Sequence, residues 1–120
     1  MKLEDKNWCF ACGKNNPIGL KLEFTKTPAG VKTIFVPARD HEGYKDIVHG
    51  GILATLLDEA LAWACISAGE KVMTVSLDLK FRKPALIDEL IQVEAKITQN
   101  LRKIIYGKAL LKTRGNQILE

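Results

Sequence analysis

The pattern of apolar and polar positions divides the chain into short alternating runs and one long apolar run. The long run covers residues 48–67, and nearly every position of 52–66 is apolar. It predicts one long helix that begins at His49-Gly50-Gly51, is apolar all round and is therefore buried. Two adjacent acids, Asp58 and Glu59, lie at its middle, where a carboxylate is costly unless it is paired or used. We therefore expect the function of the chain at this helix.

Several shorter runs have the alternation of β-strands. Residues 19–27 alternate between apolar and polar side chains, and residues 31–38 alternate in the same way after the turn Pro28-Ala29-Gly30. Gly69 is placed to end the helix. The strands expected after the helix are 72–81, 90–97 and 104–111, followed by the start of one more at 117–120.

This order of elements predicts an α+β two-layer domain with one long central helix wrapped by a curved antiparallel sheet of five to six strands. One face of a sheet cannot hide a helix that is apolar all round. Either the sheet curls strongly or a second copy of the chain covers the exposed side, so a homodimer is expected. The length of 120 residues suits a single domain, 1–120, with residues 1–18 as an irregular N-terminal segment that packs on it.

Composition changes this picture little. The apolar content of 47% and the charged content of 27% are ordinary for a soluble globular protein. The formal net charge of +4 favours mild attraction for anionic ligands, but the basic residues are scattered, so no nucleic-acid partner is expected. No secretory signal or membrane span is expected, because the first residues are polar and two acids interrupt the apolar run. Three cysteines in such a chain favour a reducing, cytoplasmic location.

The irregular N-terminal segment contains a Cys-x-x-Cys pair, Cys9 and Cys12. A structural zinc site uses four ligands, and the chain has no second cysteine pair; Cys65 and both histidines lie on or beside the buried helix. A redox pair would be expected after a strand and at a helix start. We therefore predict no metal and no cofactor, and interpret the two cysteines as small apolar side chains that pack with Trp8 and Phe10.

The His49-Gly50-Gly51 start of the helix has a chemical use beyond turning the chain. The first N–H groups of a helix have no internal partner and carry the positive end of its dipole, and glycine lets a ligand approach them. Such an end can bind an anion, or the oxyanion that forms when a carbonyl is attacked. Asp58 follows Gly50 by eight residues, about 12 Å along the helix. If both act on one carbon, they come from two chains.

These residues resemble a known family. His49-Gly50-Gly51 followed by Asp58-Glu59-Ala60 on a long apolar helix resembles the hotdog-fold acyl-CoA thioesterases of the phenylacetyl-CoA thioesterase (PaaI-like) type. Cys9-Phe10-Ala11-Cys12-Gly13 is similar to the opening of many members. Thr74, followed by Phe81-Arg82-Lys83-Pro84, resembles the next strand of the family. The resemblance covers roughly residues 8–113.

The resemblance implies hydrolysis of an acyl-CoA thioester to the free acid and coenzyme A, in sites shared by the subunits of a homodimer or of a dimer of dimers. Asp58 would be the general base or the nucleophile. The N–H of Gly50, helped by Gly51, would bind the oxyanion. His49 would hydrogen-bond near the thioester carbonyl, and Thr74 would orient the water or Asp58.

Glu59 is the alternative acid of this site. It is rotated by about 100° around the helix from Asp58, so only one of the two carboxylates can point at the site, and Asp58 matches the family position. Some family members carry an asparagine six residues before the histidine, where this chain has Gly43.

Coenzyme A carries phosphates, so the resemblance also implies basic side chains around the entrance to the site. Arg82, Lys83, Arg102, Lys103 and Arg114 lie at strand ends or turns and are the candidates, against the alternative of solvated loop charges. Two other functions remain open. One is a non-catalytic acyl-CoA-binding or regulatory hotdog domain, and the other is a hotdog hydratase, whose acid and histidine spacing is not found here.

Overall fold

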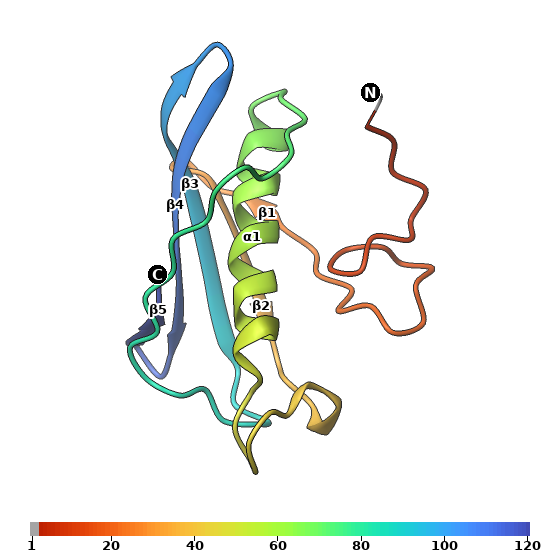
Figure 1. Ribbon diagram of the computed structural model, residues 1–120, viewed down its shortest axis with the longest axis vertical. Helices are drawn as coiled ribbons and strands as arrows, with labels where there is room; N and C mark the ends of the chain where they lie inside the picture. Colours follow the sequence, from red (N-terminus) through yellow and green to blue (C-terminus); the bar gives the residue numbers. More distant parts are fainter. Residues whose placement is uncertain (1–2) are drawn as a thin grey trace.

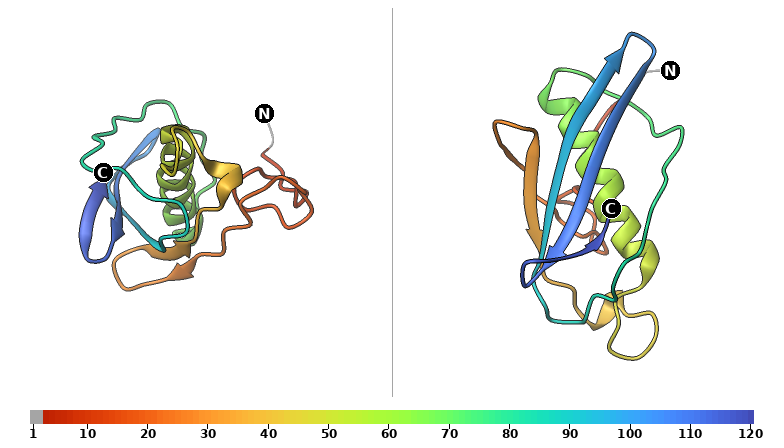
Figure 2. Two further views of the ribbon diagram at one scale, coloured as in Figure 1. Left: turned by 90° about the horizontal axis from the view of Figure 1, so that it is seen from below. Right: turned by 90° about the vertical axis from the view of Figure 1, so that its left-hand side faces the viewer.

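The protein is described by a computed structural model of residues 3–120, in which one long helix, a short 3-10 helix and five strands are formed (Figure 1). In chain order they are β1 (Thr25–Lys26), β2 (Val31–Phe35), η1 (Arg39–His41), α1 (Gly50–Ser67), β3 (Ile91–Leu101), β4 (Ile104–Thr113) and β5 (Asn116–Leu119). The strands form one antiparallel sheet in the order β1-β2-β3-β4-β5. Figure 2 shows this sheet curving around α1, which confirms the predicted α+β fold.

The sheet buries one side of α1. The helix residues that lie in the core recur at helical spacing and pack against β2, β3 and β4; they are Leu53, Leu56, Leu57, Ala60, Ala64 and Cys65. The helix comes closest to β4 at Gly107, where an added Cβ would lie 2.8 Å from Cδ2 of Leu61. The opposite side of α1 is only partly buried, and Ile66 is exposed. The predicted burial all round is therefore not reached within one chain.

The composition of α1 would also suit a membrane span. The helix has 18 residues and a mean hydropathy of 1.3. A single helix of this kind is weak evidence for a membrane, because core helices have the same composition. The packing of α1 against the sheet accounts for the apolar residues of its buried side.

The end of α1 follows the prediction from Gly69. This residue adopts a φ of 88°, which glycine reaches without steric cost. Its N–H donates to the carbonyl of Ile66 at 2.9 Å, and the N–H of Glu70 donates to the carbonyl of Cys65 at 2.9 Å. These two bonds form a Schellman motif, which satisfies carbonyls that a helix end leaves without partners.

The strand predicted over residues 72–81 is wrong. Residues 71–79 are extended but make no backbone hydrogen bond with any strand of the described chain, and residues 71–78 are exposed. Sheet contact begins only at Lys80, which bonds to Glu120, and at Phe81, which bridges to Leu119. In Figure 2 this green-to-teal segment runs outside the curved sheet. Alternation predicted an extended conformation correctly, but a strand also requires a partner.

The strand predicted over residues 19–27 is also largely wrong, because only Thr25–Lys26 pair with β2. Lys21 has a φ of 56°, which interrupts the extended backbone. The predicted alternation of burial nevertheless holds, since Leu20 and Leu22 are buried while their polar neighbours are exposed. The other predicted strands are present, with changed ends, as β2, β3, β4 and β5.

The N-terminal segment before β1 is irregular and lies beside α1 (Figure 1). Residues 1–2 of the predicted segment lie outside the described residues. Two backbone hydrogen bonds hold the loop of this segment against the residues that precede β1. The N–H of Leu20 donates to the carbonyl of Phe10 and the N–H of Leu22 donates to the carbonyl of Ala11, each at 2.9 Å. Trp8 and Phe10, which were expected to pack over the domain, are instead 60% and 40% exposed.

Candidate active site

His49 caps the start of α1 with its own side chain. Its Nδ1 accepts a hydrogen bond from the N–H of Gly51 at 2.9 Å. A ring nitrogen that accepts is unprotonated, so the neutral imidazole carries its proton on Nε2 and can donate there. The backbone N–H of His49 donates to the carbonyl of His41 at 2.8 Å, which fixes the loop that leads into the helix.

The N–H of Gly50 is the part of the helix start that remains available to a ligand. Within residues 3–120 it makes no hydrogen bond, and Gly50 is exposed. The N–H of Gly51, which was expected to help it, is already bonded to the His49 ring. Gly43 lies against His49, with an added Cβ only 3.1 Å from the His49 Cα, and brings no side chain to the site. One amide at the positive end of the helix dipole therefore faces outward.

An open cavity of about 270 Å³ lies beside this helix start. It brings Gly50 together with Arg82 and Lys83, two of the predicted coenzyme A-binding residues, and both basic side chains are exposed. The full lining consists of Ile47, Val48, Gly50, Leu53 and residues 81–85. The cavity thus combines an outward-facing amide with two cations, a combination that suits an anionic ligand.

Asp58 and Thr74 form the second part of the predicted site. The hydroxyl of Thr74 donates to Oδ1 of Asp58 at 2.5 Å. Asp58 is half-buried on the side of α1 that faces away from the sheet, whereas Thr74 belongs to the exposed segment after the helix. The predicted pairing of these two residues is therefore present, although Thr74 does not lie in a strand.

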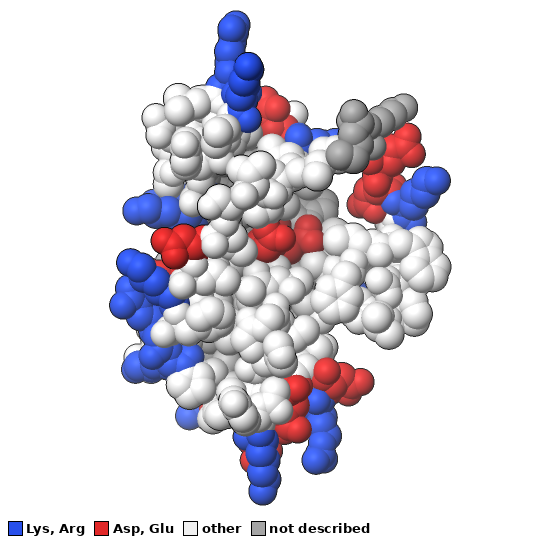
Figure 3. Space-filling model, in the orientation of Figure 1, with Lys and Arg blue, Asp and Glu red and all other residues white. Residues whose placement is uncertain are grey.

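These two parts of the site lie apart within one chain. The eight residues from Gly50 to Asp58 correspond to about 12 Å along α1. Figure 3 shows acidic side chains near the middle of this face of the molecule, surrounded mainly by uncharged residues. A small carbonyl group therefore cannot touch the Gly50 N–H and the Asp58 carboxylate of the same chain at once.

Glu59, the alternative acid, contacts the N-terminal segment instead. The thiol of Cys9 donates to its Oε2 at 3.3 Å. Burial raises the pKa of Glu59. The hydrogen bond from Cys9 opposes this rise, and the charge of Asp58 adds to it.

The sequence interpretation missed the contact between Cys9 and Glu59, because no periodicity links residues fifty positions apart. The available signal was that Glu59 had no assigned partner.

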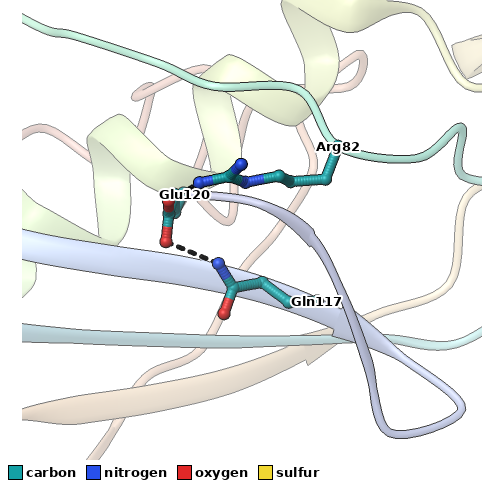
Figure 4. A network of polar contacts seen from close by, with 3 residues as sticks. All are labelled: Arg82, Gln117 and Glu120. Carbon is teal, nitrogen blue, oxygen red and sulfur yellow. Dashed lines mark hydrogen bonds and ion pairs between the residues drawn. The ribbon is translucent and has the colours of Figure 1, made fainter.

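Arg82 is held in place by the end of the chain. Its guanidinium forms an ion pair with Glu120, whose other carboxylate oxygen accepts a hydrogen bond from Gln117 at 2.5 Å (Figure 4). The hydrogen bond from Arg82, followed by that from Gln117, lowers the pKa of the Glu120 carboxyl. The arginine thus lies beside the cavity with part of its charge already compensated.

The other basic candidates lie elsewhere. Arg102 and Lys103 form the turn between β3 and β4, which Figures 1 and 2 show at the opposite end of the molecule from the start of α1. Arg114 lies in the turn before β5 and pairs with Glu89 at 3.0 Å. Of the basic candidates, Arg82 and Lys83 alone line the cavity at the helix start.

A long helix packed into a curved five-stranded antiparallel sheet is a hotdog fold. The family model described as the thioesterase superfamily matches residues 45–118. This match covers more than half of the chain, so the protein belongs to the thioesterase superfamily.

Two relatives illustrate the similarity in sequence. An uncharacterised protein of Schizosaccharomyces pombe is 38% identical over 95 residues, which cover 77% of this chain and 54% of the relative. The human acyl-coenzyme A thioesterase THEM5 is 27% identical over 84 residues, which cover 70% of this chain and 34% of the relative. The chain therefore spans about half and one third of the lengths of these two proteins.

Solved structures show the same fold at low sequence identity. A thioesterase superfamily protein aligns with a TM-score of 0.86 and 21% identity, over 99% of this chain and 66% of the other. The Escherichia coli PaaI protein aligns with a TM-score of 0.77 and 17% identity, over 83% and 78%. A hypothetical thioesterase of Streptococcus pneumoniae, solved with coenzyme A, aligns with a TM-score of 0.77 and 18% identity, over 82% and 81%.

Proposed function

We propose that this protein hydrolyses an acyl-CoA thioester to the free acid and coenzyme A. The observation that carries the proposal is the 2.5 Å hydrogen bond between Thr74 and Asp58 on the central helix of a thioesterase superfamily chain. Membership of the superfamily supports thioester chemistry. The name of THEM5 and the coenzyme A in the S. pneumoniae structure support acyl-CoA as the substrate class.

Asp58 acts as the general base in the simplest mechanism. Thr74 occupies Oδ1, which leaves Oδ2 to take a proton from water while the water oxygen attacks the thioester carbonyl carbon. The carbonyl oxygen becomes an oxyanion and accepts a hydrogen bond from the Gly50 N–H, at the positive end of α1 in the other subunit. The carbon–sulfur bond then breaks, the sulfur of coenzyme A takes up the proton held by Asp58, and the acid is released.

A nucleophilic role for Asp58 is the alternative within the same proposal. Its carboxylate would attack the carbonyl carbon, expel coenzyme A and form an anhydride that water then hydrolyses. Both routes use the same acid, the same hydroxyl and the same amide. Incorporation of ¹⁸O from labelled water into Asp58 during a single turnover would identify the anhydride route.

The catalytic unit in this proposal is a homodimer with shared sites. Two copies with antiparallel central helices would place the Gly50 N–H of one subunit beside Asp58 of the other. The segment after α1 supplies an apolar surface for this contact, since large apolar side chains on it are exposed: Val72, Met73, Val75, Leu77 and Phe81. The same arrangement would bring Arg102 and Lys103 of one subunit toward the cavity of the other.

The proposal is tested by incubating the protein with a panel of acyl- and aryl-CoAs and following the loss of thioester absorbance. Direct detection of the thioester avoids the background that three cysteines give with thiol dyes. We expect turnover of at least one substrate, and an Asp58→Asn variant about 10²- to 10⁴-fold slower in kcat, the range for loss of a general base.

Asp78→Asn is the matched control, because Asp78 is an exposed acid of the neighbouring segment outside the proposed site. It should keep wild-type turnover. Binding of acyl-CoA without turnover of any substrate would contradict the enzyme and favour a non-catalytic acyl-CoA-binding domain. Unchanged turnover in Asp58→Asn would transfer the role of the base to Glu59.

A further inference from the structure

The N-terminal segment and the middle of α1 bring together three side chains that the proposed thioesterase reaction does not use. One ligand atom from each of Cys9, Cys12 and Glu59 lies within 4.8 Å of the other two. The Cys9 sulfur lies 3.3 Å from Oε2 of Glu59. All three side chains are half-buried, so they form an enclosed cluster of two thiols and one carboxyl.

The loop that carries the two cysteines is tightly folded. The backbone N–H of Cys12 points at the Cys9 sulfur, 3.4 Å away, and the N–H of Gly13 donates to the carbonyl of Cys9 at 2.8 Å. An added Cβ at Gly13 would lie 2.4 Å from the Cys9 nitrogen and 2.7 Å from the carbonyl oxygen of Asn7, so only glycine fits there. The turn therefore holds both sulfurs close together, and an N–H bond to sulfur favours its thiolate form.

Trp63 adds a second, independent observation. Its indole N–H is buried and meets no hydrogen-bond partner within the described residues. The indole lies beside the Cys12 side chain. A buried donor without a partner is costly, and the thiolate of a metal-bound Cys12 would give it one.

We propose that Cys9, Cys12 and Glu59 bind one Zn²⁺ ion, with water in the fourth tetrahedral position. Two thiolates and a carboxylate form a ligand set that zinc prefers over magnesium or calcium. Zinc–sulfur bonds of about 2.3 Å and zinc–oxygen bonds of about 2.1 Å place tetrahedral ligand atoms roughly 3.5 to 3.8 Å apart. The observed separations, 3.3 Å between Cys9 and Glu59 and at most 4.8 Å for the other pairs, lie on both sides of this range, so each ligand atom need move by no more than about 1 Å. Binding releases the protons of the two thiols and any proton on the carboxyl to solvent.

This inference differs from the expectation drawn from sequence, which sought all four ligands among cysteines and histidines. The third ligand is the acid of α1 that had no assigned partner. The ion would fasten the irregular N-terminal segment to the central helix, one residue away from Asp58. Its role would be to stabilise the fold around the site, since the reaction proposed above has no step that uses it.

The test is zinc binding by the intact, reduced and metal-free chain, measured by competition with a chromophoric chelator. We expect one Zn²⁺ per chain and a higher Tm in the zinc-loaded protein, because a ligand that binds only the folded state stabilises it. Co²⁺ should give the near-ultraviolet thiolate charge-transfer bands and the strong visible bands of a tetrahedral site. Zinc should also protect Cys9 and Cys12 from alkylation, a readout that needs no variant.

Cys9→Ser, Cys12→Ser and Glu59→Gln should each weaken zinc binding more than tenfold, since each removes a direct ligand. Cys65→Ser is the matched control, because this third cysteine lies outside the cluster, and it should keep one zinc per chain. Absence of zinc binding to the reduced wild type, or equal binding by a Cys9→Ser/Cys12→Ser variant, would overturn the site. Wild-type affinity in Glu59→Gln would overturn the three-ligand assignment. None of these readouts depends on thioesterase activity.

Discussion

The two parts of the candidate active site are built in different ways. The helix start is held by local bonds within one chain: the His49 ring caps the Gly51 N–H, and the His49 backbone is tied to His41. The acid part joins Asp58, fixed on α1, to Thr74 on a segment whose backbone pairs with no strand of the described chain. The first part is preorganised by its own sequence neighbours, whereas the second depends on what covers the exposed segment.

This difference has a bearing on assembly. A hydroxyl on an exposed, unpaired segment orients a carboxylate poorly unless that segment is immobilised, because fixing the backbone costs about 1–2 kcal/mol per residue. Packing of the segment against a second copy would supply that energy through its exposed apolar side chains. In the proposed dimer, the association that completes the site therefore also orders its less rigid part.

After the loss of the Asp58 carboxylate, the largest effect on kcat is expected from deleting the outward-facing Gly50 amide of the rigid part. Gly50 is the first residue of α1, a position where proline is well tolerated, and His49 has a φ of −58° and a ψ of 132°, which a following proline accepts. Gly50→Pro should lower kcat about 10²- to 10³-fold, as loss of an oxyanion donor does, while Tm stays near that of the wild type.

Gly50→Ala is the control for this variant. It keeps the N–H, and its added Cβ would lie 3.6 Å from Phe81, an ordinary contact. Near wild-type turnover is expected, measured in the same thioester assay. Equal losses in both variants would show that crowding, and not the amide, is responsible.

The next effect tests whether the two parts meet across subunits. Equal amounts of Gly50→Pro and Asp58→Asn chains should be unfolded together and refolded. Half of the resulting dimers should then be heterodimers. Each heterodimer would contain one intact site of two, so about one quarter of wild-type activity should return. Verified mixed dimers without recovered activity would contradict the shared site.

A smaller effect is expected at the less rigid part. Thr74→Val removes the hydroxyl that donates to Asp58, and a hydrogen bond to a charged group contributes about 1.5–3 kcal/mol, so kcat should fall at least tenfold. Ser76→Ala removes a hydroxyl from the same exposed segment away from Asp58 and should leave kcat unchanged. A similar loss in both would indicate disturbance of the segment.

Loss of the His49 helix cap should mainly lower the free energy of unfolding. His49→Ala removes the acceptor for the Gly51 N–H and should cost about 1 kcal/mol in the free energy of unfolding. His49→Asn should restore most of this stability, because asparagine is a preferred helix cap. Denaturant unfolding of the three proteins measures the difference. Equal stability of the alanine and asparagine variants would rule out the cap.

The smallest effect is expected at the exposed ion pair beside the cavity. The pKa of Glu120 is lowered in the folded protein, so its contribution to stability is present above the ordinary glutamate pKa and is lost as the pH falls through the lowered value. Glu120→Gln should therefore lower Tm slightly at neutral pH and not at all in strong acid or high salt. A constant difference across pH would exclude the ion pair as its cause.

The fold was predictable where the signal is local. The apolar run, the His49 start and Gly69 place α1, and alternation with turns places β3 and β4. Residues 72–79 carry the same alternation but make no backbone bond to a strand among the described residues, because strand pairing is not encoded in a single run. Lys21 shows a related limit, since its positive φ interrupts a run whose burial was predicted correctly.

The two parts of the candidate active site were predicted from different kinds of information. General physics pointed to the Gly50 amide and to the distance that separates it from Asp58. The contact of Thr74 with Asp58 came from the family resemblance, because spacing alone does not bring a later segment back to the helix. The contact of Glu59 with Cys9 came from neither, since it joins an irregular loop to a helix through tertiary packing.

The order of strands in the sheet also sets how quickly the domain can fold. β3 and β4 are joined by a tight turn, and their hairpin can form within microseconds from local contacts. β2 and β3 are neighbours in the sheet, yet residues 36–90, including all of α1, lie between Phe35 and its partner Ile91. Closing that long loop costs entropy before any pairing is gained, so we expect the β2–β3 contact to form late. The residues of the candidate active site lie inside this loop, so we expect them to reach their final arrangement only after that contact has formed.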